Sequence, residues 1–198
     1  GETCRLWRDS SALGGAAASF LAEEQRPGAL WVGTPTQGLF RFTSTNATQF
    51  GAAEGMPGLR ISSITFDDDG CLWVGVFGKG LVRIRSGRMA GMVGEAEGLP
   101  ARTVGSMLMD GLGSFWLGTE RGIVRVTMAS LHQIAERRVA QGVFDLFNEA
   151  DGMHSAECAD GCHPTAVRDE TGRLWFATAS GVVTVDPRTV QLGFRFEF

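Results

Sequence analysis

Short stretches of alternating side-chain orientation recur along the chain and predict strands, because successive residues of a strand point to opposite faces. Four stretches share one pattern around a tryptophan: Leu30–Thr34, Leu72–Val76, Phe115–Thr119 and Leu174–Thr178. In each, the tryptophan and the small residue two positions later face one way, and their apolar neighbours face the other. We expect sheets that are buried on both faces, with the tryptophans serving as core residues. We also expect the small residue to leave room for an aromatic ring from an adjacent sheet.

The spacing of these stretches predicts a repeat architecture. Trp31, Trp73, Trp116 and Trp175 are 42, 43 and 59 residues apart, and propeller blades recur about every 40–50 residues. A second strand follows each tryptophan stretch, at Gly38–Phe42, Gly80–Ile84, Gly122–Val126 and Gly181–Val185. Another precedes it, most clearly at Ile61–Phe66 and Val104–Met109, and a weaker one ends the unit near Thr48–Phe50 and Arg88–Met92. Four short strands per unit predict one propeller blade.

The segments between the units repeat as well. Glu54–Pro57 and Glu97–Pro100 are near-copies, and Ala150–Met153 is a degenerate third copy. The long third interval has a local cause, since apolar residues at 131, 134, 135 and 139 have helical spacing after a capping segment, Thr127–Ser130. We therefore predict a short helical insertion at about 128–139 in the third blade.

Composition supports many turns and argues against two classes of partner. The chain of 198 residues contains 28 glycines, which suit tight turns. A net charge of −4 and a pI near 5.4 disfavour nucleic acid. No run of about 18 apolar residues predicts a membrane span, and no signal peptide is visible. The first residue is Gly1, as expected of a processed product or an excised piece.

The whole chain resembles the two-component regulator propeller repeat of bacterial sensor proteins. Glu97–Val126 carries nearly all of that pattern, with Leu112 as one extra residue in its turn. Asp151–Met153, Gly172–Thr178 and Val185–Pro187 resemble the final blade before an immunoglobulin-like module. The resemblance implies seven-bladed propellers outside the inner membrane, which pass a signal, commonly from carbohydrate fragments, through a transmembrane helix to a kinase or a cyclase.

We therefore expect an all-β chain of about four four-stranded antiparallel blades over residues 1–190, forming the C-terminal part of a seven-bladed propeller. A closed four-bladed ring is the alternative. Residues 191–198 are expected to begin a β-sandwich module or to form a last outer strand, and Arg5–Trp7 to be a stray outer strand. An open run of blades exposes sheet faces, which predicts self-association.

The propeller geometry predicts a ligand-binding face, because the connections between blades and the second hairpin of each blade open on one side. That face should carry cationic and amide side chains, which suit an acidic or hydroxyl-rich ligand. They are Arg60, Arg102 and His163 from the connections and Gln37, Lys79 and Arg121 from the hairpins.

One loop contains a weak metal-site candidate, made of His154, Cys158, Cys162 and His163. Its spacing differs from the usual paired zinc ligands, so a Cys158–Cys162 disulfide and ordinary loop residues remain alternatives. Cys4 and Cys71 are expected to be unpaired, and the run Asp67–Asp69 to be a solvated hairpin. No catalytic motif appears, so we predict no catalytic residue and no cofactor.

The function that these features predict is a ligand-sensing module of a periplasmic two-component or hybrid signalling protein. Its partners would be a small molecule or an oligosaccharide and other blades or domains of the same protein. A propeller enzyme such as a lyase and a protein–protein interaction scaffold are the alternatives.

Overall fold

The computed structural model describes residues 10–24, 28–160 and 163–189, and in these the chain forms antiparallel sheets with one α-helix. Each sheet is a meander of strands that are consecutive in sequence. Blade 1 contains β1 (Phe20–Glu24), β2 (Ala29–Gly33), β3 (Leu39–Phe42) and β4 (Ala47–Phe50). Blade 2 contains β5 (Ile61–Phe66), β6 (Leu72–Val76), β7 (Gly80–Arg85) and β8 (Arg88–Val93). Blade 3 contains β9 (Val104–Met109), β10 (Ser114–Thr119), β11 (Gly122–Thr127) and β12 (Asp145–Phe147), and blade 4 contains β13 (Ala166–Arg168), β14 (Leu174–Thr178) and β15 (Gly181–Val185).

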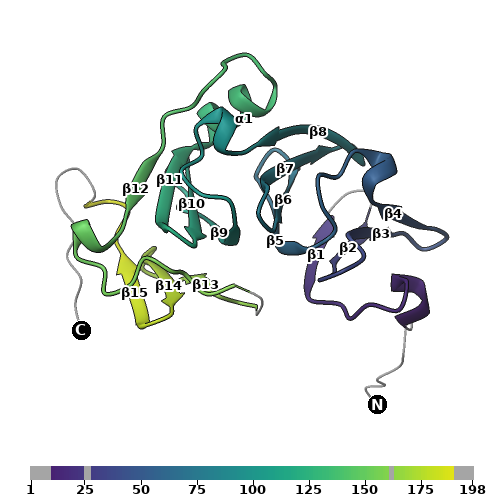
Figure 1. Ribbon diagram of the computed structural model, residues 1–198, viewed down its shortest axis with the longest axis horizontal. Helices are drawn as coiled ribbons and strands as arrows, with labels where there is room; N and C mark the ends of the chain where they lie inside the picture. Colours follow the sequence, from purple (N-terminus) through teal and green to yellow (C-terminus); the bar gives the residue numbers. More distant parts are fainter. Residues whose placement is uncertain (1–9, 25–27, 161–162, 190–198) are drawn as a thin grey trace.

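The blades follow one another along an arc, as in a propeller (Figure 1). The first strands β1, β5, β9 and β13 lie on the inner side, where each contacts the first strand of the next blade, and β4, β8 and β12 lie outside. The all-β propeller fold predicted from the repeats is thus confirmed. Blade 4 has three strands within the described residues. The expected segments Arg5–Trp7 and 191–198 lie outside the described residues.

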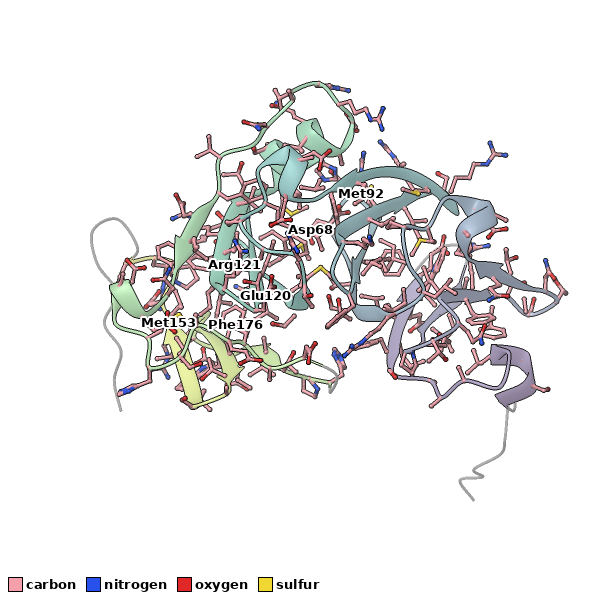
Figure 2. The ribbon with its side chains drawn as sticks, in the orientation of Figure 1. Asp68, Met92, Glu120, Arg121, Met153 and Phe176 are labelled. Carbon is pink, nitrogen blue, oxygen red and sulfur yellow. The ribbon has the colours of Figure 1, made fainter. Side chains whose placement is uncertain are left out.

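Apolar cores lie between successive blades. Trp31 packs with Leu72 and Val74 of blade 2, because alternation along β2 directs the indole toward the next sheet. Trp73 packs in the same way on Phe115 and Leu117 of blade 3. Trp116 packs on blade 4, against Leu174 and Phe176; Phe176 is labelled in Figure 2. The structural role predicted for these tryptophans therefore holds at each interface between blades.

The glycine two positions after the tryptophan has the expected aromatic neighbour in only one of three blades. A Cβ on Gly33 would lie 2.8 Å from Ile61 Cγ2, and one on Gly75 would lie 2.5 Å from the Val104 carbonyl oxygen. An aromatic ring, that of Phe176, approaches only the position of Gly118, at 3.2 Å. The expected aromatic neighbour is therefore wrong at two of three glycines, where an aliphatic side chain or the backbone of the next first strand takes that space.

The connections between blades share one turn, formed by η2 (Ala52–Glu54), η3 (Glu95–Glu97) and η4 (Glu149–Asp151). In each, the last acidic side chain accepts a hydrogen bond from the backbone N–H three residues earlier, at 2.8, 2.8 and 3.0 Å. A glycine in the left-handed region then ends the turn. The degenerate third copy has the same backbone as the other two, because aspartate can replace glutamate in this bond.

The inserted helix α1 (Met128–Ala135) occupies the first part of the stretch predicted to be helical. The Thr127 hydroxyl accepts a hydrogen bond from the Ser130 N–H at its N-terminus. Leu131 and Ile134 are buried, and the helix packs across β8 and β11, on the outer side of the arc (Figure 1). Arg137 has a φ of 57°, which is incompatible with a continuing helix.

Within the described residues, no helix combines the length and the apolar character needed to span a membrane.

Candidate ligand-binding site

Two kinds of loop meet at one end of the sheets, which we call the connection face. It consists of the blade connections 51–60, 94–103 and 148–160 with 163–165, and of the hairpins 34–38, 77–79, 120–121 and 179–180. Backbone hydrogen bonds join the two kinds: Phe77 N–H donates to the Arg60 carbonyl at 2.9 Å, and Cys158 N–H to that of Thr119 at 3.0 Å. Connections and second hairpins therefore share one face, as the propeller geometry predicts.

A pocket of about 180 Å³ opens on this face between blades 2, 3 and 4. Four loops contribute to its walls, two hairpins and two blade connections, so no single blade could form it. The lining residues are Phe77, Thr103, Gly105, Thr119, Glu120, Glu157, Cys158 and Asp160. Carboxylates and hydroxyls thus line a pocket with an aromatic ring at its wall.

Glu120 is held in place by the backbone of the preceding connection. Its two carboxylate oxygens accept hydrogen bonds from the N–H groups of Arg102 at 2.7 Å and Thr103 at 2.9 Å. Glu120 and Arg121 lie next to each other on the hairpin of blade 3 (Figure 2). A carboxylate that is fixed by two backbone donors presents its remaining lone pairs in a defined direction.

The predicted arginines of blades 2 and 3 do not act as isolated cations. The Nε of Arg102 lies 2.7 Å from a Glu95 oxygen, and Nη2 of Arg121 lies 4.0 Å from the other. Because both arginine side chains are more than half exposed, these pairs contribute little stability. The Glu95 carboxylate nevertheless offsets part of the positive charge of these two arginines.

Arg60 and Phe77 form a flat, partly exposed platform beside the pocket. The Arg60 guanidinium lies 3.7 Å from the centre of the Phe77 ring, and 42% of the Phe77 side chain is exposed. The same guanidinium is 3.9 Å from an Asp160 oxygen. Stacking between a guanidinium and an aromatic face fixes the orientation of both.

The other three predicted residues do not line this pocket either. His163 packs edge-on against Phe20 of blade 1, with ring centres 6.1 Å apart. Lys79 is exposed on the hairpin of blade 2, and the Gln37 carbonyl accepts a hydrogen bond from Gln49 within blade 1. None of the six predicted residues is itself a lining residue. Arg102, Arg121 and Lys79 lie within two positions of one, and Arg60 contacts Phe77 and Asp160. A role in binding stays a prediction for all six.

The predicted metal-site loop has one member that burial makes a poor ligand. Burial raises the pKa of the Cys158 thiol to about 11, so the thiol keeps its proton at neutral pH. Cys158 also lies against the backbone of the blade 3 hairpin. Cys162 and Cys4 lie outside the described residues, so the alternatives for this loop stay open.

Sequence reasoning missed the acidic half of the face. Glu95, Glu120 and Asp160 each approach an arginine predicted to be a ligand contact. Glu95 shares a connection with Arg102, whereas Glu120 and Asp160 come from other segments of the chain than Arg102 and Arg60. Phe77 had a recognisable signal, since the hairpins of blades 1, 3 and 4 contain small or polar residues at this turn.

Comparison with known proteins supports the blade assignment. Residues 55–78 match the model of the family described as two component regulator propeller. They run from the connection after blade 1 through the tryptophan strand of blade 2. No curated protein matches the sequence significantly.

Several solved structures share the fold. The extracellular domain of a protein described as a hybrid two component system, from B. thetaiotaomicron, superposes with a TM-score of 0.70 at 22% identity. The extracellular domain of a one component system from the same organism gives 0.70 at 20%. The alignments cover 86% and 91% of this chain but only 22% and 26% of those domains, so this chain spans about a quarter of their length. Virginiamycin B lyase from Staphylococcus aureus gives 0.55 at 15%, over 90% of this chain and 58% of the lyase.

Proposed function

We propose that this chain, which matches the two component regulator propeller model at residues 55–78, is the ligand-sensing part of an extracytoplasmic bacterial signalling protein. The pocket between blades 2, 3 and 4 on the connection face carries this proposal. Its walls come from the hairpin of blade 2, from blade 3 and from the connection that leads to blade 4, so a bound ligand would contact all three at once. Such a site can convert binding into a change of the angles between blades.

The ligand class that this pocket favours is a neutral, hydroxyl-rich molecule such as an oligosaccharide. Carboxylates accept hydrogen bonds from hydroxyl groups, and charge-assisted hydrogen bonds are the stronger kind. The Phe77 ring can pack on the apolar face of a sugar ring. Because Glu95 and Asp160 lie close to the neighbouring arginines, the charge of the face does not favour an anionic ligand over a neutral one.

A binding role fits the pocket better than catalysis. None of the described residues that line it is a histidine, and its cysteine keeps a proton at neutral pH. General acid–base catalysis requires a group whose pKa is near the working pH. The similarity to virginiamycin B lyase concerns the fold, and folds of this kind carry unrelated functions.

Calorimetric titration with a panel of neutral and anionic oligosaccharides tests this function. We expect saturable binding of at least one neutral oligosaccharide, weakened about tenfold or more by Phe77→Ala, because truncating a central aromatic contact costs about 1–3 kcal/mol. Leu112→Ala is the matched control: Leu112 is 64% exposed on a hairpin at the other end of the sheets. Equal affinity in both variants would place the ligand elsewhere, and uniform silence across the panel would favour a protein–protein scaffold.

The relay from this module to an output domain is part of the same proposal. Two of the structural neighbours are extracellular domains of signalling systems, and we propose that the full-length protein passes ligand binding to a kinase or a cyclase across the inner membrane. The gene sequence downstream of this chain tests the relay. A product without a membrane-spanning helix and an output domain would contradict it.

A further inference from the structure

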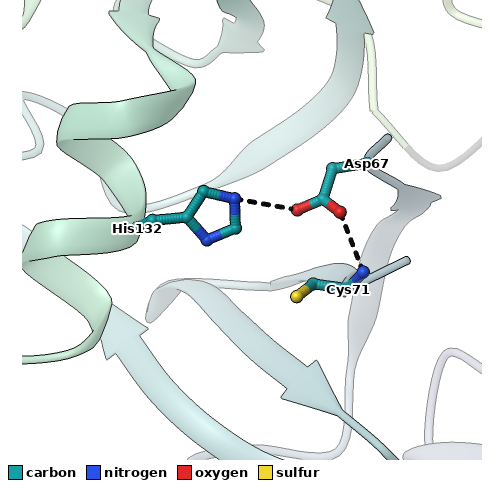
Figure 3. A group of neighbouring side chains, drawn as sticks. All are labelled: Asp67, Cys71 and His132. Atoms are coloured by element: carbon teal, nitrogen blue, oxygen red, sulfur yellow. Dashed lines mark hydrogen bonds and ion pairs between the residues drawn. The ribbon is translucent and has the colours of Figure 1, made fainter. Parts of the chain in front are cut away.

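A second polar cluster lies at the opposite end of the sheets from the connection face. The hairpin between β5 and β6 of blade 2 meets helix α1 of the blade 3 insertion there (Figure 3). Asp67 and Cys71 belong to the hairpin, and His132 projects from the helix toward Asp67. Asp67 is buried, so the expectation that Asp67–Asp69 is a solvated hairpin is wrong at its first residue.

The cluster brings four potential metal ligands together. One ligand atom each from Asp67, Cys71 and His132 lies within 4.8 Å of the other two. His132 Nε2 is 3.2 Å from an Asp67 oxygen and 3.6 Å from an oxygen of Asp69, whose side chain is 75% exposed. Ligand atoms of a tetrahedral zinc site lie roughly 3–4 Å apart. Small side-chain adjustments would therefore let these atoms share one ion.

The surroundings of Cys71 suit a metal-bound thiolate. Arg83, which is buried, donates a hydrogen bond from Nη2 to Cys71 Sγ at 3.3 Å. Glu136, just after α1, lies 2.9 Å from Arg83 Nη1 and compensates its charge. Such outer contacts orient the ligands of a metal and stabilise the charge on them.

Comparison with blades 3 and 4 shows which residues of this hairpin recur in other blades and which occur in blade 2 alone. Asp110 and Asp169 occupy the position of Asp67 in blades 3 and 4, and each accepts a hydrogen bond from the tryptophan indole of its own blade. The positions of Cys71 are taken there by Ser114 and Arg173. The carboxylate therefore has a structural role in every blade, whereas the thiol and the imidazole are additions in blade 2.

Two further observations indicate that the cluster receives a cation. His132 Nδ1 is one of the four buried side-chain polar atoms that lack a hydrogen-bond partner among the described residues, and such atoms are rare unless water or an ion completes the site. In addition, a pocket of about 510 Å³ lined by Glu23, Glu24 and Asp67–Asp69 opens beside the hairpin. Its negative charge raises the local concentration of cations.

We propose that Asp67, Cys71 and His132, with Asp69 as the fourth ligand, form a zinc site that fastens helix α1 to blade 2. The mixture of thiolate, imidazole and carboxylate is one that Zn²⁺ accepts and that Ca²⁺ and Mg²⁺ do not favour. On binding, the Cys71 sulfur exchanges its proton for a bond to the metal, and the proton goes to solvent. The ion would link the second and third blades on the face away from the ligand pocket.

Titration of the chain with Co²⁺, which replaces zinc and is visible in absorption spectra, tests the site. We expect one Co²⁺ per chain, a thiolate-to-cobalt charge-transfer band, and loss of the band when Zn²⁺ is added. Cys71→Ser should abolish the band, and His132→Ala should weaken Co²⁺ binding at least tenfold. Cys158→Ser and His154→Ala, which alter the other buried thiol and another histidine, should leave both unchanged.

Thermal melts with added metal ions distinguish binding at this site from binding in the acidic pocket, and they show whether each variant is folded. Zn²⁺ should raise the Tm of the wild-type chain, and Ca²⁺ or Mg²⁺ should not. Asp67→Asn should lose this rise, whereas Asp110→Asn, which alters the equivalent carboxylate of blade 3, should keep it. Absence of the charge-transfer band in the wild-type chain, its persistence in Cys71→Ser, or an equal Tm rise with Ca²⁺ overturns the proposal.

Discussion

At the scale of single residues, one hydrogen bond recurs in all four blades. The indole N–H of Trp31, Trp73, Trp116 and Trp175 donates to Glu24, Asp67, Asp110 and Asp169, at 3.1, 2.7, 3.0 and 2.9 Å. Asp67 and Asp110 also accept from backbone N–H groups of the following turn. The carboxylate thus satisfies the one polar atom of a tryptophan that is otherwise in the core, and it fixes the turn at the same time.

This bond predicts an acid-sensitive contribution from Asp169. Hydrogen bonds from the Thr171 hydroxyl and the Trp175 indole lower the pKa of Asp169 well below its ordinary value. A carboxyl with a lowered folded-state pKa stabilises the fold above its unfolded-state pKa of about 4, and this stabilisation is lost as the pH falls. Asp169→Asn should therefore melt below the wild type at pH 7, and the gap should close toward pH 2 in a series of thermal melts. Glu170→Gln, a change at the exposed neighbour, is the control; a gap that does not change with pH contradicts the account.

At the scale of elements, the close approach between blades 2 and 3 depends on a glycine in the tryptophan strand. The Val104 carbonyl accepts hydrogen bonds from the hydroxyls of Ser62 and Ser63, at 2.8 and 2.6 Å. A Cβ at Gly75 would lie 2.7 Å from the Ser62 hydroxyl and 2.5 Å from that carbonyl. The glycine of the tryptophan strand therefore sets the distance between the inner strands of blades 2 and 3.

Gly75→Ala should destabilise the protein by about 1–3 kcal/mol, because the added methyl group forces the inner strands apart in a packed region. Gly51→Ala is the matched control, since its nearest neighbouring atoms would be 3.8 Å from the new Cβ and its φ is −127°. We expect that control to change stability by less than about 1 kcal/mol. Urea unfolding measures both values, and equal effects would show that the contact with blade 3 is unimportant.

At the scale of the whole molecule, the two ends of the arc differ. Blade 1 turns Val32, Phe40 and Phe42 toward η1 (Ser10–Leu13), and Leu13 is buried against them. On blade 4, the face that carries Trp175 also presents Val167 and Val182, which are 48% and 64% exposed. In blades 1 to 3 the corresponding face packs on the next blade. Trp175 is only half-buried for that reason.

The exposed face of blade 4 predicts self-association of this chain. Apolar side chains that are contiguous on a sheet face gain free energy when they are removed from water. Light scattering should show a mass that rises with protein concentration, and Val182→Lys should shift the chain toward the monomer. Val143→Lys is the control, because Val143 is 83% exposed on the loop after α1. A concentration-independent monomer would contradict this prediction and favour a closed ring.

The local pattern of side chains was sufficient to predict the strands and their grouping into blades. Ile61–Phe66 and Val104–Met109 were predicted with the bounds that the structure has, because alternation and turn residues act over a few positions. The ligand pocket could be predicted only in part. The loops that form it follow from blade geometry, but Glu120 and Asp160 reach Arg102 and Arg60 from other segments of the chain.

The sequence by itself determined the repeated unit: short antiparallel strands, a tryptophan in the second, and the turns that join them. These features depend on neighbours in the chain, so each copy specifies its own blade. Only the tertiary structure decided which side chains of different blades meet. Asp67 and Cys71 meet His132 because the blade 3 insertion folds back across the last strand of blade 2. Contacts of this kind depend on the packing of whole sheets, and no local pattern encodes them.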